Sequence, residues 1–354
     1  MAGAKLGPWH GAELRKTADA FSGDGSDNDL PEEVRFARGV GRLLLKRIRS
    51  VGATMRRDAI SVFLLHPDGI ASVPAKREPM LGDGGVEVAG RIWFVSETAQ
   101  SGKSIEPPSI DAGAVFDHVA ELGLGAVPAV AFNPTVEPPT LRYYPRGLND
   151  HHNPEVIEIN DIEVTAERIE TIIERLWEAC FITPDAQISG GSDVWADASQ
   201  HWAASNAEAV VQAHIKAALA IGLVDCTIRD EQPTVAGRVD IEIERKDPVD
   251  PSKWSRPFEI EVKVLRHAGR TGRKTSAKLI QWWIKRGIRQ AAAYRDARNA
   301  ENGMLCCFDM RNSDHGDDYA DNDNKAFAAT HNVTMVRKFL YNDAEALRVA
   351  RYGS

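Results

Sequence analysis

Two carboxylates and one amine in the second half of the chain have the types and spacing that metal-assisted chemistry needs. Asp240 lies in one run of alternating apolar and polar residues, and Glu261 and Lys263 lie in another. Because successive side chains of a strand point to opposite faces, Glu261 and Lys263 share a face, whereas Val262 points the other way. If the two strands are neighbours, Asp240 joins them in a small acidic pocket with one ammonium group at its edge.

Such a pocket suits a hard divalent cation. Mg²⁺ prefers oxygen ligands and is often held by one or two carboxylates together with phosphate groups of a substrate. A metal in this position acidifies water and neutralises charge on phosphorus, and a nearby ammonium orients the attacking water or stabilises the phosphorane. We therefore expect Asp240 and Glu261 to bind Mg²⁺, with Mn²⁺ as a substitute.

The elements that must position these residues follow a regular order. We expect a helix over 199–222, strands over 224–229, 237–244 and 258–265, a helix over 276–298 and a strand over 304–310. This order is αβββαβ. After the strand over 304–310 we expect an acid-rich, solvated loop over 313–324, an edge strand over 333–341 and a closing helix over 344–351. The strand over 304–310 accounts for Cys306 and Cys307 as core residues without reactivity.

The order and the residues together resemble the PD-(D/E)xK nuclease superfamily, which has the restriction-endonuclease-like fold. Asp240 matches the aspartate of that motif, and Glu261, Val262 and Lys263 match its (D/E)xK. Val239 stands where the motif has proline, a variation that leaves the metal ligand in place. The resemblance covers the second half of the chain.

The resemblance also implies roles for further residues. The carbonyl of Val262 is implied as a third metal ligand, and Lys263 as the group that positions the attacking water. Gln290 and Tyr294, which share one helix face at i and i+4, resemble the Gln-x3-Tyr pair of several branches, and we expect them to orient the pocket or to contact the phosphate. Glu208, on the helix before the strands, is expected to add an acidic group at the metal site.

A basic segment follows the Glu-x-Lys strand, and Asp296 is the only acid over 263–298. Phosphate contacts supply most of the sequence-independent affinity for nucleic acid. The residues that we expect to make such contacts are Arg266, Arg270, Arg273, Lys274 and Lys278. Trp282 and Trp283 are interpreted as core residues of the long helix rather than as base-stacking groups. The net charge of −8 argues against a protein that coats nucleic acid, but not against a local basic surface.

The first half of the chain shows no recognisable chemistry. We expect a flexible leader over 1–29, a mixed α/β domain over 30–185, a linker over 186–198 and the nuclease-like domain over 199–354. Within the N-terminal domain we expect a helix from about residue 29 to 57 and a sheet with tight antiparallel hairpins. Its first strands are expected over 59–65, 70–73, 86–89 and 91–96.

Composition agrees with an ordinary globular protein. Of the 354 residues, 43% are hydrophobic and 27% are charged, which leaves ample chain for a buried core. No apolar run approaches the length of a membrane helix, and the start of the chain lacks the apolar segment of a signal peptide. The four cysteines show neither zinc spacing nor a disulfide framework, so we expect a cytoplasmic protein with reduced thiols.

These features predict a Mg²⁺-dependent endodeoxyribonuclease, a hydrolase of phosphodiester bonds. Its N-terminal domain would control target choice, assembly or activation, and by analogy the protein would serve restriction or antiviral defence. Two alternatives stay open: a catalytically inactive nucleic-acid-binding or scaffold protein, and an enzyme or sensor centred on the N-terminal domain. An ordinary half-solvated hairpin also shows the alternation around Asp240. DNA is the expected partner, RNA remains an alternative, and double-strand cutting would favour a homodimer.

Overall fold

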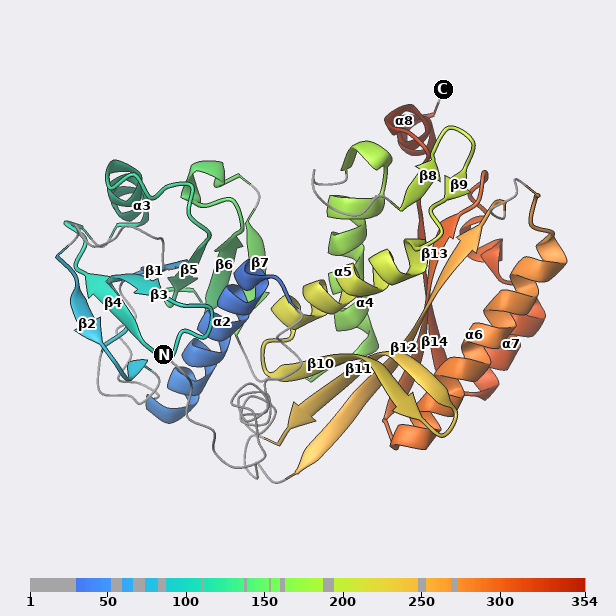
Figure 1. Ribbon diagram of the computed structural model, residues 1–354, viewed down its shortest axis with the longest axis horizontal. Helices are drawn as coiled ribbons and strands as arrows, with labels where there is room; N and C mark the ends of the chain where they lie inside the picture. Colours follow the sequence, from blue (N-terminus) through green and yellow to red (C-terminus); the bar gives the residue numbers. More distant parts are fainter. Residues whose placement is uncertain are drawn as a thin grey trace, which may run out of the picture. The chain divides into compact units, whose positions relative to one another are not determined.

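The computed structural model divides the chain into two compact units (Figure 1). The residues that it describes are 30–51, 59–65, 74–81, 87–109, 111–136, 139–152, 154–159, 163–186, 194–247, 253–268 and 273–353. The first unit comprises Met1–Glu163 and Ala220–Asp225, and the second comprises Val164–Leu219 and Cys226–Ser354. Both units combine helices with a sheet, which confirms the expected α/β class. Among the helices that the structure describes, none has the length and apolar composition that a membrane crossing requires.

A seven-stranded sheet forms the centre of the first unit, in the order β2-β4-β3-β1-β5-β6-β7. Its strands are β1 (Ser61–Leu65), β2 (Lys76–Glu78), β3 (Ile92–Val95), β4 (Gly102–Ile105), β5 (Ala129–Asn133), β6 (Thr140–Tyr144) and β7 (Glu155–Glu158). β1 and β3 are parallel, whereas the other neighbours are antiparallel. The expectation of hairpins throughout is therefore wrong at the centre of the sheet, because the chain crosses over between β1 and β3 and places β2 at the edge. The strand expected over 70–73 lies outside the described residues, and 87–89 forms no strand.

Two helices of the first unit cover opposite faces of this sheet. They are α2 (Glu32–Val51) and α3 (Ala112–Glu121). Alternate side chains of β1 separate the two faces, since Phe63 packs in one cluster with α2, and Val62 packs in another with α3. This unit therefore has three layers. The remainder of the helix expected up to residue 57 lies outside the described residues.

The second unit contains a five-stranded sheet in the order β10-β11-β12-β13-β14. Its strands are β10 (Cys226–Thr234), β11 (Gly237–Lys246), β12 (Trp254–Arg266), β13 (Asn302–Met310) and β14 (Val333–Phe339). β10, β11 and β12 pair antiparallel, and β12, β13 and β14 pair parallel. The strands expected in this half are confirmed. Cys306 and Cys307 are buried in β13, and burial raises the pKa of the Cys306 thiol to about 12.

Helices cover both faces of this second sheet (Figure 1). They are α4 (Ala166–Leu176), α5 (Ala207–Gly222), α6 (Ala277–Arg298) and α7 (Asn322–Thr330), whereas the terminal α8 (Ala344–Tyr352) lies beyond the ends of the strands. Cys307 of β13 packs in one cluster with residues of α6 and α7. On the other face, the ring of Phe308 lies 5.5 Å from that of Phe181, which follows α4, and Phe181 lies 5.1 Å from His214 of α5. The second unit is thus also a three-layer structure.

The helix α5 begins later than its sequence pattern predicts. A short hairpin of β8 (Trp195–Asp197) and β9 (Trp202–Ala203) occupies the start of the segment over which we expected a helix from residue 199. Asp197 Oδ1 accepts hydrogen bonds from Ser199 Oγ at 2.7 Å and from the Gln200 amide at 3.2 Å. These contacts hold a turn that competes with the helix, which explains the difference.

The division between the units also differs from the predicted boundary near 186–198. The α4 segment was expected in the N-terminal domain, but it packs on β14 in the second unit. Trp177 Nε1 donates to the carbonyl of Phe339 at 2.7 Å, and Glu174 forms an ion pair with Lys338 of β14. These contacts join segments far apart in sequence, so no local pattern indicates them.

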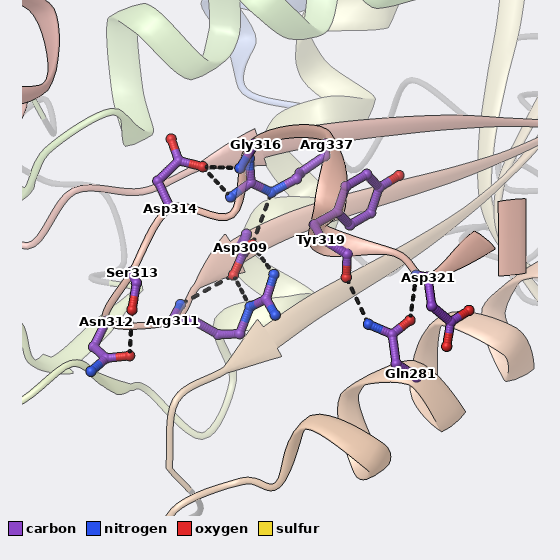
Figure 2. Close-up of polar contacts among 10 residues, drawn as sticks. All are labelled: Gln281, Asp309, Arg311, Asn312, Ser313, Asp314, Gly316, Tyr319, Asp321 and Arg337. Atoms are coloured by element: carbon purple, nitrogen blue, oxygen red, sulfur yellow. Dashed lines mark hydrogen bonds and ion pairs between the residues drawn. The ribbon is translucent and has the colours of Figure 1, made fainter. Parts of the chain in front are cut away.

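The acid-rich loop between β13 and β14 is anchored rather than simply solvated (Figure 2). Asp309 at the end of β13 is fully buried and accepts a hydrogen bond from Arg337 Nε at 2.8 Å. Arg337 Nη2 also donates to Asp314 at 2.7 Å. Gln281 of α6 donates to the carbonyl of Tyr319 at 2.9 Å. The loop is therefore fixed against both β14 and α6, and it leads into α7, which the sequence pattern did not predict.

Candidate active site

The strands β11 and β12 part where the predicted carboxylates lie. Their paired register ends at Ile241 and Ile260, while β11 stays paired with β10 as far as Gly237. Beyond this fork the amides of β12 that face β11 need other acceptors. Carboxylates supply them.

Asp240 and Glu208 cap these two amides. Asp240 Oδ2 accepts a hydrogen bond from the Val262 amide at 2.8 Å, and Glu208 Oε2 accepts one from the Val264 amide at 3.3 Å. Asp240 comes from β11 and Glu208 from the first turn of α5. The fork therefore draws carboxylates from two separate elements to one stretch of β12.

Glu261 and Lys263 lie side by side at this fork, as the alternation predicts. Lys263 Nζ lies 2.6 Å from Glu261 Oε1 and 3.5 Å from Glu208 Oε1, and it donates to the carbonyl of Val262 at 3.0 Å. The Glu261 side chain is only 1% exposed. The ammonium group therefore lies among the carboxylates rather than at their edge.

The helix α5 contributes more than Glu208. Gln212, one turn further along, donates to the carbonyl of Asp240 at 2.8 Å and to Glu231 Oε1 at 3.2 Å. Lys216, another turn on, pairs with Asp230 at 2.7 Å. Sequence reasoning missed Gln212 and Lys216. Their spacing of four residues within an otherwise apolar helix was the signal that could have found them.

Gln290 and Tyr294 meet on the face of α6 that looks toward β12. Gln290 Nε2 donates to the Tyr294 hydroxyl at 3.1 Å. Gln290 Oε1 is buried and has no hydrogen-bond partner within the described part of the chain. A β-carbon added at Gly287, one turn before Gln290, would lie 3.4 Å from Lys263 Cγ. Gly287 and Tyr294 therefore lie on the side of α6 that faces the strands, Gly287 beside Lys263 and Tyr294 beside Gly237 of β11.

Burial dominates the electrostatics of the fork. It raises the pKa of Glu261 to about 8, against the lowering effect of the Lys263 ammonium. Burial also raises the pKa of Asp240, and its hydrogen bond from Val262 opposes that shift. Burial alone would lower the pKa of Lys263, but the carboxylates of Glu261 and Glu208 raise it above its ordinary value. The site therefore keeps a charged lysine and lacks enough positive charge for its carboxylates.

A second layer of acids continues along the same face of β11 and β12 and is covered rather than solvated. Glu242 and Glu259 are fully buried. Arg298 of α6 donates to Glu242 Oε1 at 2.9 Å, and Arg256 donates to Glu244 Oε1 at 2.9 Å. Burial, followed by the charge of Glu242, raises the pKa of Glu259 to about 9, which favours the neutral form of this carboxyl. The ion pairs of this layer connect β11 to β12 and to α6 next to the fork.

The predicted nucleic-acid contacts separate into three groups. Arg266 donates to the carbonyls of Ala204 at 3.0 Å and Ser205 at 3.2 Å, so it links β12 to the turn before α5. Arg270 lies outside the described residues. The exposed residues of the predicted set are Arg273, Lys274 and Lys278. Arg266 thereby helps to position Glu208, while a phosphate contact by the exposed residues stays a prediction.

The donor set at the fork fits a hard cation only when the backbone is included. Within the described ranges, no group of three or more His, Cys, Asp and Glu side chains is arranged to hold a metal ion. Asp240, Glu261 and the Val262 carbonyl together provide three hard oxygen donors. Glu261 Oε2 is buried and has no hydrogen-bond partner in the described part of the protein. A cation bound there would give this oxygen a partner and would favour the ionised forms of Asp240 and Glu261.

Comparison of the chain with protein-family models, curated proteins and solved structures found no match.

Proposed function

We propose that this protein is a metal-dependent nuclease that hydrolyses phosphodiester bonds in DNA. The observation that carries the proposal is the fork between β11 and β12, where Asp240, Glu261, Lys263 and the Val262 carbonyl converge. The element order α5-β10-β11-β12-α6-β13 supports a restriction-endonuclease-like core, because β10, β11 and β12 pair antiparallel and β13 pairs parallel with β12. These two observations support the same activity independently, because the first concerns the side chains at the fork and the second concerns the order and pairing of the strands.

The residues at the fork have distinct roles in the proposed reaction. Asp240, Glu261 and the Val262 carbonyl would hold Mg²⁺ or Mn²⁺, which supplies acidified water and charge neutralisation when bound. Lys263, whose pKa is raised, stays protonated at neutral pH. It therefore acts as a cation that orients the attacking water and stabilises charge on phosphorus, and not as a general base. Glu208 keeps that ammonium in place from α5.

Gln290 and Tyr294 extend the site toward the substrate. The Gln290 oxygen, which has no partner within the described residues, and the Tyr294 hydroxyl offer polar groups on the side of α6 that faces the strands, suited to holding the attacking water or a phosphate in position. The first unit would control target choice, assembly or activation, in keeping with a restriction or antiviral role. Homodimers would supply the two sites that double-strand cutting needs.

The test compares plasmid cleavage by the wild type and by Asp240→Asn in Mg²⁺, Mn²⁺ or EDTA. The substitution keeps an acceptor for the Val262 amide but removes the charge that a metal needs. Asp296→Asn, an exposed change on α6, is the matched control. We expect metal-dependent nicking or linearisation by the wild type and the control only.

Two results would contradict the proposal. One is cleavage that persists in Asp240→Asn or in EDTA. The other is a wild type that neither cleaves DNA nor binds Mg²⁺ or Mn²⁺ by calorimetry. This second result would favour a catalytically inactive nucleic-acid-binding protein.

A further inference from the structure

The outer face of α6 carries an exposed tryptophan among cations. Leu279, Trp282, Arg286 and Arg289 recur at intervals of three and four residues, so they form one stripe along the helix. Trp282 is 51% exposed and Leu279 is 40% exposed. The opposite face of α6 supplies the core residues, including Ile284. Leu279 and Trp282 therefore leave much of their apolar surface in solvent, and the interpretation of Trp282 as a core residue is wrong.

The charge of this helix is opposite to that of the chain. The chain has a net charge of −8, whereas α6 has Asp296 as its only acid among many basic residues. Arg295 and Arg298 contact Asp296 and Glu242. Lys278, Arg286 and Arg289, in contrast, are exposed along the stripe. These three cations and the indole ring present a surface that favours an anion with planar apolar groups.

The ring of Trp282 has a cation beside it. The Arg286 guanidinium lies 5.6 Å from the ring centroid, a distance at which the cation is attracted to the aromatic face. Arg289 packs in the same way over Phe327 of α7, with its guanidinium 5.6 Å from that ring. A planar guanidinium and an indole together form a stacking platform for a base.

The stripe is separate from the catalytic fork. Trp282 precedes Gly287, the neighbour of Lys263, by five residues, which places it about 140° around the helix and about 7.5 Å along it. A strand on the stripe therefore does not occupy the fork. Bases inside a duplex are covered by their neighbours, whereas unpaired bases expose their faces for stacking.

We propose that this stripe, together with Lys278 one turn before Trp282, binds single-stranded nucleic acid, with a base stacked on Trp282 and phosphates contacted by the cations. The proposal deepens the proposed function and rests on it, because it assigns a place for an unpaired strand near the cleavage site. An acidic peptide would use the cations but would supply no planar base for the tryptophan. This difference in chemistry favours nucleic acid.

The test measures binding of a fluorescein-labelled oligothymidylate of about 20 nucleotides by anisotropy in EDTA, with full-length protein. Trp282→Ala is expected to weaken binding between about 5-fold and about 150-fold, the range for loss of one stacked base. Trp282→Phe should recover most of the affinity. Trp254→Ala is the matched control, since that ring is 40% exposed and has Lys246 4.7 Å from its centroid. It should bind as the wild type does.

The salt dependence of oligonucleotide binding tests the phosphate contacts independently. Arg286→Gln should reduce the slope of log affinity against log salt by about 0.7, the value for one phosphate contact with a single strand. The proposal is overturned if the wild type does not bind the oligonucleotide, if Trp282→Ala binds as well as Trp254→Ala, or if polyglutamate displaces the oligonucleotide at equal charge concentration. Because binding is measured in EDTA, failure of the nuclease proposal would appear as absent plasmid cleavage with this binding intact.

Discussion

Replacement of Lys263 by methionine tests the ion pair at the centre of the site. Lys263→Met keeps most of the side-chain volume but removes an ammonium that lies 2.6 Å from Glu261 Oε1. Breaking a buried ion pair by removing one partner costs about 3–5 kcal/mol, because the remaining charge is left without compensation. Replacing both partners by neutral groups is often neutral or stabilising. Since the Lys263 side chain is 18% exposed, we expect the single substitution to cost about 3 kcal/mol.

The assay is a double-mutant cycle on the full-length protein. Urea and thermal unfolding at about pH 9, above the pKa of about 8 that Glu261 has in the folded protein, would compare the wild type, Lys263→Met, Glu261→Gln and the double variant. For a unit of the size of the second one, a loss of about 3 kcal/mol lowers its Tm by about 6–12 °C. The double variant should recover most of this loss, because neither charge remains. A double variant as unstable as Lys263→Met, or a single variant as stable as the wild type, would refute the reasoning.

The same variants separate stability from catalysis. Both Lys263→Met and the double variant should cleave plasmid DNA at least about 100-fold more slowly, because loss of one preorganised electrostatic group typically costs that much. Their affinity for DNA in EDTA should stay close to that of the wild type. Lys325→Met, at a half-exposed position on α7, is the control. Undiminished cleavage by the stable double variant would remove Lys263 and Glu261 from the mechanism.

Two further predictions follow from single positions. At Gly237 the backbone has φ +133° and a β-carbon would lie 2.9 Å from the Tyr294 hydroxyl, so Gly237→Ala should cost about 1–3 kcal/mol of unfolding free energy and slow cleavage. The control is Gly316→Ala, with φ +51° and no atom within 4 Å, which should cost stability but leave cleavage unchanged. Equal cleavage rates of the two variants would contradict the role of Tyr294. Burial lowers the pKa of His214 below 6.5, so the unfolded chain binds more protons and the stability that neutral His214 provides is lost as pH falls below 6.5. His214→Phe, which keeps the ring beside Phe181, should lose less unfolding free energy between about pH 7.5 and about pH 5.5, and equal losses would contradict this assignment.

The elements of the second unit could be predicted from local patterns, with specific exceptions. The strands that carry Asp240 and Glu261 alternate strictly, and the helix that carries Gln290 has a clear start and end, so their predictions are confirmed. The start of α5 was missed because the Asp197 side chain stabilises a competing turn. In the first unit, the parallel pairing of β1 with β3 was missed because a strand pattern does not identify the neighbouring strand.

Part of the candidate site could also be predicted from local sequence patterns. The shared face of Glu261 and Lys263 follows from the two-residue period of a strand. The environment of that face did not follow, because Arg298 of α6 and Gln212 of α5 arrive from elsewhere in the chain. Alternation predicted a polar face, and only packing against α6 buried it.

The amino-acid sequence by itself determined which residues could do chemistry and which strand faces they occupy, because side-chain direction depends on the local backbone. The tertiary structure alone decided that β11 and β12 part at Asp240, that Glu208 caps the amide of Val264, and that Trp282 faces solvent rather than the core. These features depend on strand register and helix packing. Both are settled by contacts between distant segments, whose free energies no local pattern contains.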